Sequence, residues 1–357
     1  MSQTKAQLIA GTASQDVTFD DATVNSLNGG PLAGTRNRII NGNFDIWQRG
    51  TSTATWVAPI SNFYWPDRWV FSSAGTGGNG SVSQQAFTAG QTDVPGEPTY
   101  FLRWQITSAP SGQTTGSCYV EQRIEDVRTL AGRTATISFY AKGTGTLPNI
   151  YLTQTFGSGG STQVAYTLAT NVALNASWTK YTYTVNVGSI SGKTIGTNHY
   201  VGLTFMVPIN STYTLDLAQV QVEPGTVATP FERRSYGQEL ALCQRYYYRI
   251  TRNASVDIRI GVGQAIGTGT GDYMVQYPVT MRDSPTALEQ SGTAADYQVL
   301  SSNGSFITAS AVPTHQTGSL NTATLRVSVA SGLTAGNCSF LSLQNTGDGY
   351  LAWSAEL

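Results

Sequence analysis

The sequence predicts an all-β protein made of an antiparallel β-sandwich, a short linking helix and a second, smaller C-terminal β-sandwich domain. Three observations predict this class. Gly, Thr and Ser make up a third of the 357 residues, and only 11% are charged, a composition that favours short strands and tight turns. Short alternating stretches recur between clusters of Gly, Ser, Asn and Pro, as in antiparallel sheets. Only one segment has the three-and-four spacing of a helix.

Four segments are expected along the chain. Residues 1–35 are polar apart from one short apolar run, and we expect an arm that becomes ordered on another surface. Residues 36–233 form the larger sandwich, 234–252 the linking helix and 253–357 the smaller domain. The chain shows no fixed-period repeat and no sustained heptads, so we expect neither a solenoid nor a coiled coil.

Alternation indicates the strands of the larger sandwich. Residues 181–187 place Tyr and Val side chains on one face, and residues 134–141 and 200–207 alternate in a similar way. Residues 213–217 also alternate, but the pattern loses phase before Val220. An extra residue in one strand would cause such a slip, so we expect a β-bulge there.

The predicted helix begins at a capping box, because Ser235 and Gln238 are three residues apart. A single apolar stripe follows. Its members are Tyr236, Leu240, Cys243 and Tyr247. A stripe of this width suits a helix that packs on its own domain or on its copies in a bundle, so these four residues are candidates for the seam of a trimer.

The smaller domain resumes the strand pattern at residues 275–278 and 324–329. Residues 261–272 are rich in Gly but lack the Lys-Ser/Thr ending and the helix of a phosphate-binding loop. We expect this stretch to form a loop, together with residues 301–305 and 314–319, and these loops are the first candidates for a binding tip.

Charge and cysteine content exclude several classes of protein. The net charge is −1 and the isoelectric point is about 6.1, so the chain has no basic surface for nucleic acid. No run of 18 apolar residues predicts a membrane span, and residues 1–15 do not resemble a secretory signal. Three widely spaced cysteines indicate neither a disulfide framework nor a zinc site. We therefore expect assembly in a reducing cytoplasm.

Candidates for catalysis are few. With only two histidines in the chain, a nucleophilic triad or a His-ligated metal is not expected. Glu121 and Glu125 would share one face of a strand, as a hydrolase pair could. Arg123 and Arg128 lie among them, however, so ion pairing explains the cluster at least as well. We expect no enzyme activity, and keep a carboxylate pair as the alternative.

Aromatic residues near predicted loops are the stronger functional signal. Flat rings stack on sugar faces while neighbouring polar groups bind the hydroxyls. Trp69 and Trp178 are expected in the core, and His315 is expected to contact a receptor from a polar loop. The aromatic candidates for glycan binding are Trp47, Trp56, Tyr64, Trp65, Tyr100 and Trp104.

Several longer motifs resemble a known family. They are residues 37–50 (NRIINGNFDIWQRG), 67–69 (DRW), 218–225 (AQVQVEPG), 229–233 (TPFER), 239–248 (ELALCQRYYY), 277–285 (YPVTMRDSP) and 353–357 (WSAEL). Together these motifs resemble phage tail-fibre and receptor-binding proteins. The sandwich is similar to carbohydrate-binding jelly rolls of the cellulase-associated type, and residues 21–29 look like the attachment arms of cyanobacterial-virus fibres.

The resemblance implies a homotrimeric virion appendage. Its arm would bind other tail or baseplate proteins, and residues 253–357 would form the distal tip that adheres to host-surface glycan through trimeric avidity. Jelly rolls of this kind often hold a structural calcium ion, for which only Asp45 and Asp216 match. The alternatives are a structural tail, collar or baseplate fibre without glycan affinity, and a tailspike depolymerase that uses Glu121 and Glu125.

Overall fold

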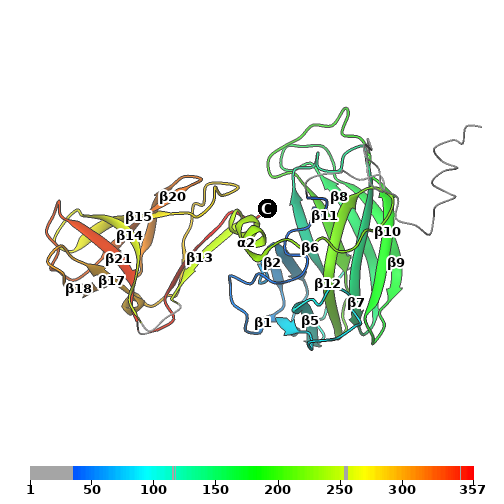
Figure 1. The fold of residues 1–357 in the computed structure, drawn as a ribbon, viewed down its shortest axis with the longest axis horizontal. Helices are drawn as coiled ribbons and strands as arrows, with labels where there is room; N and C mark the ends of the chain where they lie inside the picture. Colours follow the sequence, from blue (N-terminus) through cyan, green and yellow to red (C-terminus); the bar gives the residue numbers. More distant parts are fainter. Residues whose placement is uncertain (1–34, 115, 117, 253–255, 346) are drawn as a thin grey trace, which may run out of the picture.

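The chain folds into two β-lobes that meet at one short helix, α2 (Tyr236–Gln244) (Figure 1). The computed structural model describes residues 35–114, 116, 118–252, 256–345 and 347–357. The predicted arm therefore lies outside the described residues, apart from its last position. Both lobes consist of antiparallel strands, and the predicted all-β class is confirmed.

The larger lobe is a jelly-roll sandwich of two six-stranded sheets. The first sheet has the spatial order β1 (Ala54–Val57), β4 (Asn79–Ala86), β5 (Tyr100–Ser108), β12 (Tyr213–Pro224), β7 (Thr134–Gly143) and β10 (Thr179–Asn186). The second sheet has the order β2 (Ile60–Tyr64), β3 (Trp69–Ser73), β6 (Cys118–Glu125), β11 (Tyr200–Met206), β8 (Thr146–Thr155) and β9 (Val164–Ala173).

The core of this sandwich is aromatic. Trp69, predicted as a core residue, is fully buried, as are Phe71 and Trp104. The rings of Phe71 and Trp104 meet edge to face with centroids 5.2 Å apart, a favoured geometry for aromatic pairs. Burial of each large apolar side chain stabilises the fold by about 1.5–3 kcal/mol.

The predicted β-bulge is confirmed in β12. The register against β7 shifts between Ala218 and Gln221, and Gln219 has a φ of 47°. The amide of Val220 donates instead to the carbonyl of Gly42 at 2.9 Å. The bulge thus turns the Gln219 side chain toward the loop at Pro95, whose carbonyl oxygen it contacts at 2.6 Å.

The linking helix is shorter than predicted. Ser235 and Gln238 form the expected capping box, but the helix ends at Gln244. Tyr247 belongs to β13 (Tyr247–Thr251), where it pairs with Ser354. The predicted stripe is therefore broken after Cys243, because the ladder with the C-terminal strand holds the following residues in extended conformation.

The C-terminal domain is also a sandwich. Its small sheet has the order β13, β22 (Tyr350–Ser354) and β16 (Glu289–Gln290), and a 3₁₀ turn at Ala294–Asp296 precedes β17. Its large sheet has the order β18 (Phe306–Thr308), β17 (Tyr297–Leu300), β21 (Cys338–Leu343), β14 (Ile258–Ala265), β15 (Thr270–Gln276), β20 (Thr322–Ser328) and β19 (Thr314–Gly318).

Two of the three loops predicted in this domain are strands in the structure, so these two predictions are wrong. Residues 261–272 belong mostly to the hairpin of β14 and β15. The glycine at position 263 permits this close pairing, since a Cβ there would overlap the carbonyl oxygen of Asp272. Residues 314–318 form β19, an edge strand paired with β20. Residues 301–305 do form a loop between β17 and β18.

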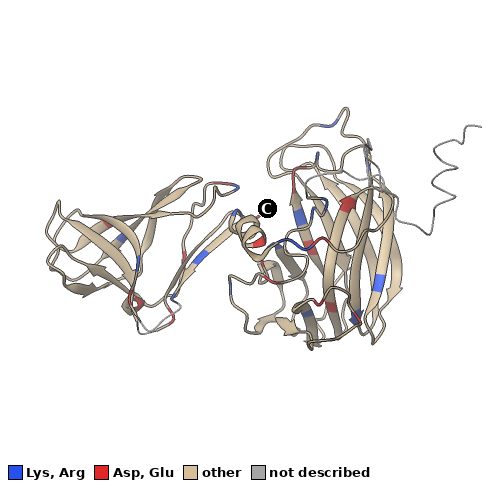
Figure 2. Ribbon diagram, viewed as in Figure 1, with Lys and Arg blue, Asp and Glu red and all other residues tan. Residues whose placement is uncertain are grey.

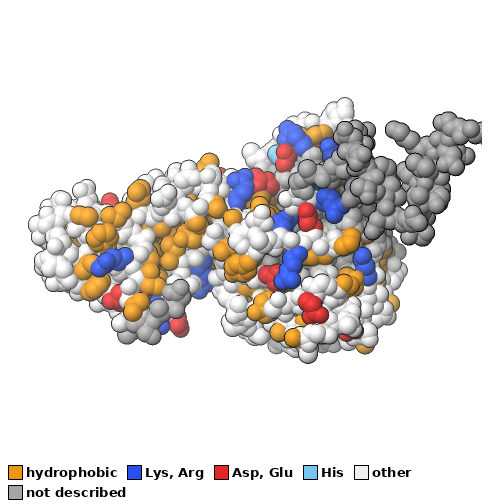
Figure 3. Space-filling view, viewed as in Figure 1, with side chains coloured by type: hydrophobic (Ala, Val, Ile, Leu, Met, Phe, Trp, Pro, Cys, Tyr) orange, Lys and Arg blue, Asp and Glu red, His pale blue; other side chains and the backbone are white. Residues whose placement is uncertain are grey.

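An apolar row crosses the outer face of the large C-terminal sheet. Phe340, Val262 and Met274 lie opposite one another on β21, β14 and β15, so their side chains share one face. They are 37%, 46% and 50% exposed. Figure 3 shows apolar side chains gathered on this domain, and Figure 2 shows how sparse charges are over both sandwiches.

A buried guanidinium joins the two lobes. Arg68 is 2% exposed, pairs with the carboxylate of Glu356, and lies 3.4 Å from the centroid of the Tyr246 ring. The Nη2 atom of Arg68 donates to the carbonyl oxygen of Arg123. We call these four residues the junction cluster. The neighbouring Asp67 accepts two hydrogen bonds from Gln48 and forms no ion pair with Arg68.

The cysteines are free in the described structure, with Cys118 and Cys243 buried and Cys338 exposed. Among the described residues, no helix has the length and apolar content needed to cross a bilayer.

We predict that Glu356→Gln destabilises the protein by about 3 kcal/mol, because it leaves the Arg68 charge buried without its partner. Equilibrium denaturation in urea measures this change. Arg128→Gln is the matched control, since its pair with Asp126 is about half exposed and such pairs contribute less than about 1 kcal/mol. Equal losses for the two variants would contradict the role of the junction cluster.

Candidate functional site

A cleft of about 430 Å³ lies where the two lobes meet. We call it the junction cleft. The sandwich contributes Arg49, Asn62, Phe63, Tyr64 and Trp65, and the C-terminal domain contributes Tyr247, Arg249, Glu289, Tyr350 and Ser354. Ligand sites occur preferentially at domain interfaces of this kind.

One wall of the cleft comes from β2 and the residue that follows it. Phe63 and Trp65 are two positions apart, so their side chains project on the same side. Their rings are parallel within 1°, with centroids 6.3 Å apart, and both are partly exposed. The indole nitrogen of Trp65 donates to the carbonyl oxygen of Ser52 at 3.0 Å, which fixes the orientation of the larger ring.

The opposite wall is built from arginines stacked on tyrosines. The Arg49 guanidinium lies 3.6 Å from the Tyr247 ring centroid, and that of Arg249 lies 3.7 Å from the Tyr350 ring centroid. Arg249 also donates to the carbonyl oxygen of Arg49 at 3.0 Å. Stacked guanidinium groups of this kind are attracted by the ring faces, so this wall holds its shape without a ligand.

Two phenols of the cleft act as fixed hydrogen-bond donors. Tyr64 donates to the carbonyl oxygen of Leu357 at 2.9 Å, and Tyr247 donates to Glu289 at 2.9 Å. Burial raises the pKa of both phenols well above the ordinary value. Both groups therefore stay protonated at neutral pH, and neither can act as a base.

The lining of the junction cleft suits a polar ligand that also has an apolar face. Phe63 and Trp65 offer ring surface, while Asn62, Ser354 and Glu289 offer an amide, a hydroxyl and a carboxylate, and all three are exposed. A sugar ring presents both an apolar face and hydroxyl groups, and this combination of partners suits it.

The structure distributes the predicted glycan-binding residues over several places. Tyr64 and Trp65 lie together in the junction cleft. Trp47, Trp56 and Trp104 are only 6%, 5% and 0% exposed and belong to the sandwich core. They cannot stack on a sugar, so these three predictions are wrong.

The two remaining candidates lie elsewhere. Tyr100 is half-buried at the start of β5, and His315 is half-buried on β19 rather than in a loop. Desolvation lowers the pKa of His315, so it is neutral at pH 7. Sequence reasoning missed Arg49, Arg249 and Tyr350, because each contacts residues that are distant in the chain, and no local pattern marks such contacts.

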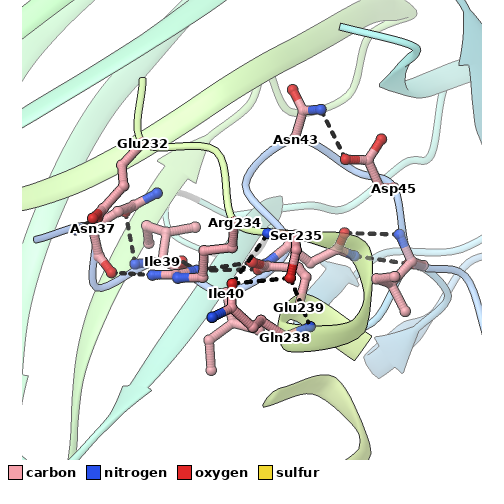
Figure 4. Close-up of polar contacts among 12 residues, drawn as sticks. Asn37, Ile39, Ile40, Asn43, Asp45, Glu232, Arg234, Ser235, Gln238 and Glu239 are labelled. Atoms are coloured by element: carbon pink, nitrogen blue, oxygen red, sulfur yellow. Dashed lines mark hydrogen bonds and ion pairs between the residues drawn. The ribbon is translucent and has the colours of Figure 1, made fainter. Parts of the chain in front are cut away.

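The proposed calcium ligands do not meet the needs of a cation. Both carboxylate oxygens of Asp216 accept hydrogen bonds from Arg103, at 2.8 and 2.7 Å, and Lys142 lies 3.9 Å away. Asp45 accepts from Asn43 at 2.8 Å (Figure 4). Among the described residues, no cluster of three or more His, Cys, Asp or Glu is placed to hold a metal ion. Asp216 is thus held by cationic side chains rather than set aside for calcium.

The two glutamates considered as a hydrolase pair are engaged separately. Glu121 accepts from Arg123 at 2.8 Å and from Thr204 at 2.6 Å. Glu125 accepts from Arg245 at 2.8 Å and from Tyr246 at 2.6 Å. Burial raises the pKa of Glu125, but these two hydrogen bonds and the charges of Arg245 and Arg282 together keep the pKa below the ordinary value. A general acid needs the opposite shift, so ion pairing explains the cluster better.

Comparisons with known proteins find resemblance in structure alone. No family model matches the chain, and no curated protein matches it. A putative sugar binding protein from Bacteroides thetaiotaomicron is 11% identical with a TM-score of 0.33, and the likeness covers 53% of this chain and 100% of that one. The family 11 carbohydrate-binding module of a Clostridium thermocellum cellulase is 14% identical with a TM-score of 0.28, covering 50% and 98%.

A third solved structure comes from a phage. The enzymatically active domain of tailspike protein 4 from bacteriophage CBA120 is 12% identical with a TM-score of 0.28, and the likeness covers 53% of this chain but 21% of that one. These scores are low, so the role of each residue below rests on its own contacts.

We predict that Glu125→Gln makes the protein less stable at neutral pH by about 1 kcal/mol, a modest value because the pair is partly exposed. The folded pKa of Glu125 is lowered, so its stabilisation is present above the ordinary value of 4.5 and is lost as pH falls through the folded pKa. The difference between variant and wild type should therefore shrink in acid. Urea denaturation across this pH range, with the exposed Asp93→Asn as control, measures it. A constant difference would contradict the pairing.

Proposed function

We propose that this protein is a non-enzymatic adhesin that binds cell-surface glycan in the junction cleft. One observation carries the proposal: the parallel rings of Phe63 and Trp65 share a single cleft with the polar groups of Asn62, Glu289 and Ser354. The rings would stack on the apolar face of a sugar, and the polar groups would exchange hydrogen bonds with its hydroxyls. The stacked arginines of the opposite wall limit the ordering cost of binding.

We further propose that the protein is a phage tail fibre or receptor-binding protein. The motif at residues 37–50 and the motif at 239–248, which resemble that family, contact each other: the amide of Asn41 donates to Glu239, and the side chain of Gln48 donates to the carbonyl oxygen of Tyr247. Residues 1–35 would attach the chain to other tail or baseplate proteins. The site would then lie between the lobes rather than at a distal tip, because the cleft needs residues from both.

Avidity would supply the strength that one shallow cleft lacks. Stacking and a few hydrogen bonds give weak affinity, and several linked copies raise the effective affinity by orders of magnitude without new contacts. Such a protein would act as a homotrimer. Two exposed surfaces could form its seam: Tyr236 on α2, which is 65% exposed, and the apolar row that contains Met274.

We predict that Trp65→Ala reduces retention on a printed glycan array by at least about tenfold, since stacking by one aromatic ring contributes roughly 0.5–1.5 kcal/mol per copy and avidity multiplies the loss. Phe306→Ala is the matched control, because it removes an exposed ring beside the loop at residues 301–305. If Phe306→Ala abolishes retention and Trp65→Ala does not, recognition lies at the C-terminal tip. A wild-type chain that binds no glycan would overturn the adhesin in favour of a structural fibre.

We predict a native mass of three times the 38.1 kDa of the chain, measured by light scattering. Met274→Glu should lower this mass if the apolar row is the seam, and Tyr236→Glu should lower it if α2 is the seam, because each change places a charge in a desolvated contact. A monomeric wild type at micromolar concentration contradicts the trimer but leaves the cleft intact.

A further inference from the structure

A second pocket lies on the outer face of the first sheet of the larger sandwich. We call it the sheet-face pocket. It has a volume of about 410 Å³, and it lies between the loop at Pro95 and residues 228–233. No residue of the junction cleft lines it, so the two sites are built from different parts of the chain.

The floor of the sheet-face pocket is set by strand register. Tyr140 on β7 lies opposite Lys180 on β10 and opposite Ala218 on β12, so these three side chains share one face. Phe139 points the other way, into the core. The small side chain of Ala218 leaves the Tyr140 ring partly exposed, and the bulge places Gln219 at the rim.

The wall at residues 229–233 is held by buried and partly buried hydrogen bonds. Glu223 accepts from the amide of Thr229 at 2.8 Å and from its hydroxyl at 2.7 Å. The amide of Glu232 donates to Gln221 at 2.8 Å, and its carboxylate accepts from the amide of Asn37 at 2.6 Å. The pocket wall is therefore preorganised before any ligand arrives.

Figure 4 shows how the chain continues beyond this wall. Arg234 donates to the carboxylate of Glu239 on α2 and to the backbone carbonyls of Asn37 and Ile39. Arg233, one residue earlier, is left exposed at the pocket. Arg234 thus stabilises the fold, whereas Arg233 is available at the surface of the pocket.

The lining of the pocket is positively charged. Lys180 and Arg233 are its charged residues, and within the described part of the chain neither forms an ion pair. The two glutamates of the neighbouring wall do not line the pocket: Glu223 is 1% exposed and accepts from Thr229, and Glu232 accepts from the amide of Asn37. Asp45 interacts electrostatically with Arg233 but does not line the pocket. In a chain with only four lysines, two cations at one aromatic hollow favour an anionic ligand.

We propose that the sheet-face pocket binds a carboxylate-bearing sugar unit of an acidic saccharide. The sugar ring lies against Tyr140, and the carboxylate pairs with Lys180 and Arg233. The amide of Gln219 is placed to contact a hydroxyl at the rim. This site works without the junction cleft, and a chain that carries both can hold two units of one polymer or two different glycans.

The test is an array of oligosaccharides that contain uronic or sialic acids, each printed beside its carboxyl-reduced neutral form, with the full chain as analyte. We expect an acidic form to bind more tightly than its reduced form. Lys180→Gln and Arg233→Gln should each weaken acidic binding by about tenfold, as expected for the loss of one charge-assisted hydrogen bond. Lys193→Gln, which removes an exposed lysine elsewhere on the sandwich, is the control.

Trp65→Ala separates this proposal from the adhesin cleft. It should leave the preference for acidic forms intact while it weakens binding in the junction cleft. Equal binding of acidic and reduced forms, or acidic binding that Lys180→Gln and Arg233→Gln leave unchanged, overturns the sheet-face site. A preference for uronic over sialic acids, or the reverse, identifies which carboxylate sugar fits. Unchanged melting temperatures of the two variants show that the fold is intact.

Discussion

The buried guanidinium of Arg68 is the constraint on which the arrangement of the two lobes depends. Its backbone lies in the left-handed region, with a φ of 72°, and its charge is balanced by Glu356, which follows the last strand, β22. A charge with so little exposure is tolerated only where partners satisfy it. Arg68 follows β2 in the chain and Glu356 follows β22. Their contact therefore brings the aromatic wall of Trp65 and the arginine wall of Arg249 to one cleft.

The positions of the arginines and lysines give a physical reason for the excess of arginine over lysine in the sequence. Most cations of this chain are arginines, and several stack on tyrosine rings at the junction rather than standing free in solvent. Lysines are rare, and one of the four lines the sheet-face pocket. The sandwich supplies weakly charged surfaces, and at the junction its arginines are stacked on tyrosine rings.

Local patterns were predictable from the sequence, and contacts between distant segments were not. The bulge at Ala218 followed from a loss of alternation, and the cap at Ser235 from residue spacing. Tyr247 continued the helical stripe in sequence, yet its ladder with β22 holds it in a strand. Trp104 and Trp65 look alike in sequence, and only the packing of the two sheets separates a core residue from a cleft residue. Arg49 and Tyr350 line one cleft although some three hundred positions separate them in the chain, and no local pattern predicts this.

Hydrogen–deuterium exchange of the full chain, with and without the glycan that it retains most strongly on an array, tests the central claim most directly. The account predicts protection at residues 60–65 together with residues 350–354, since both walls of the junction cleft would contact the sugar. Protection confined to the loop at residues 301–305, or no glycan retained at all, would contradict it.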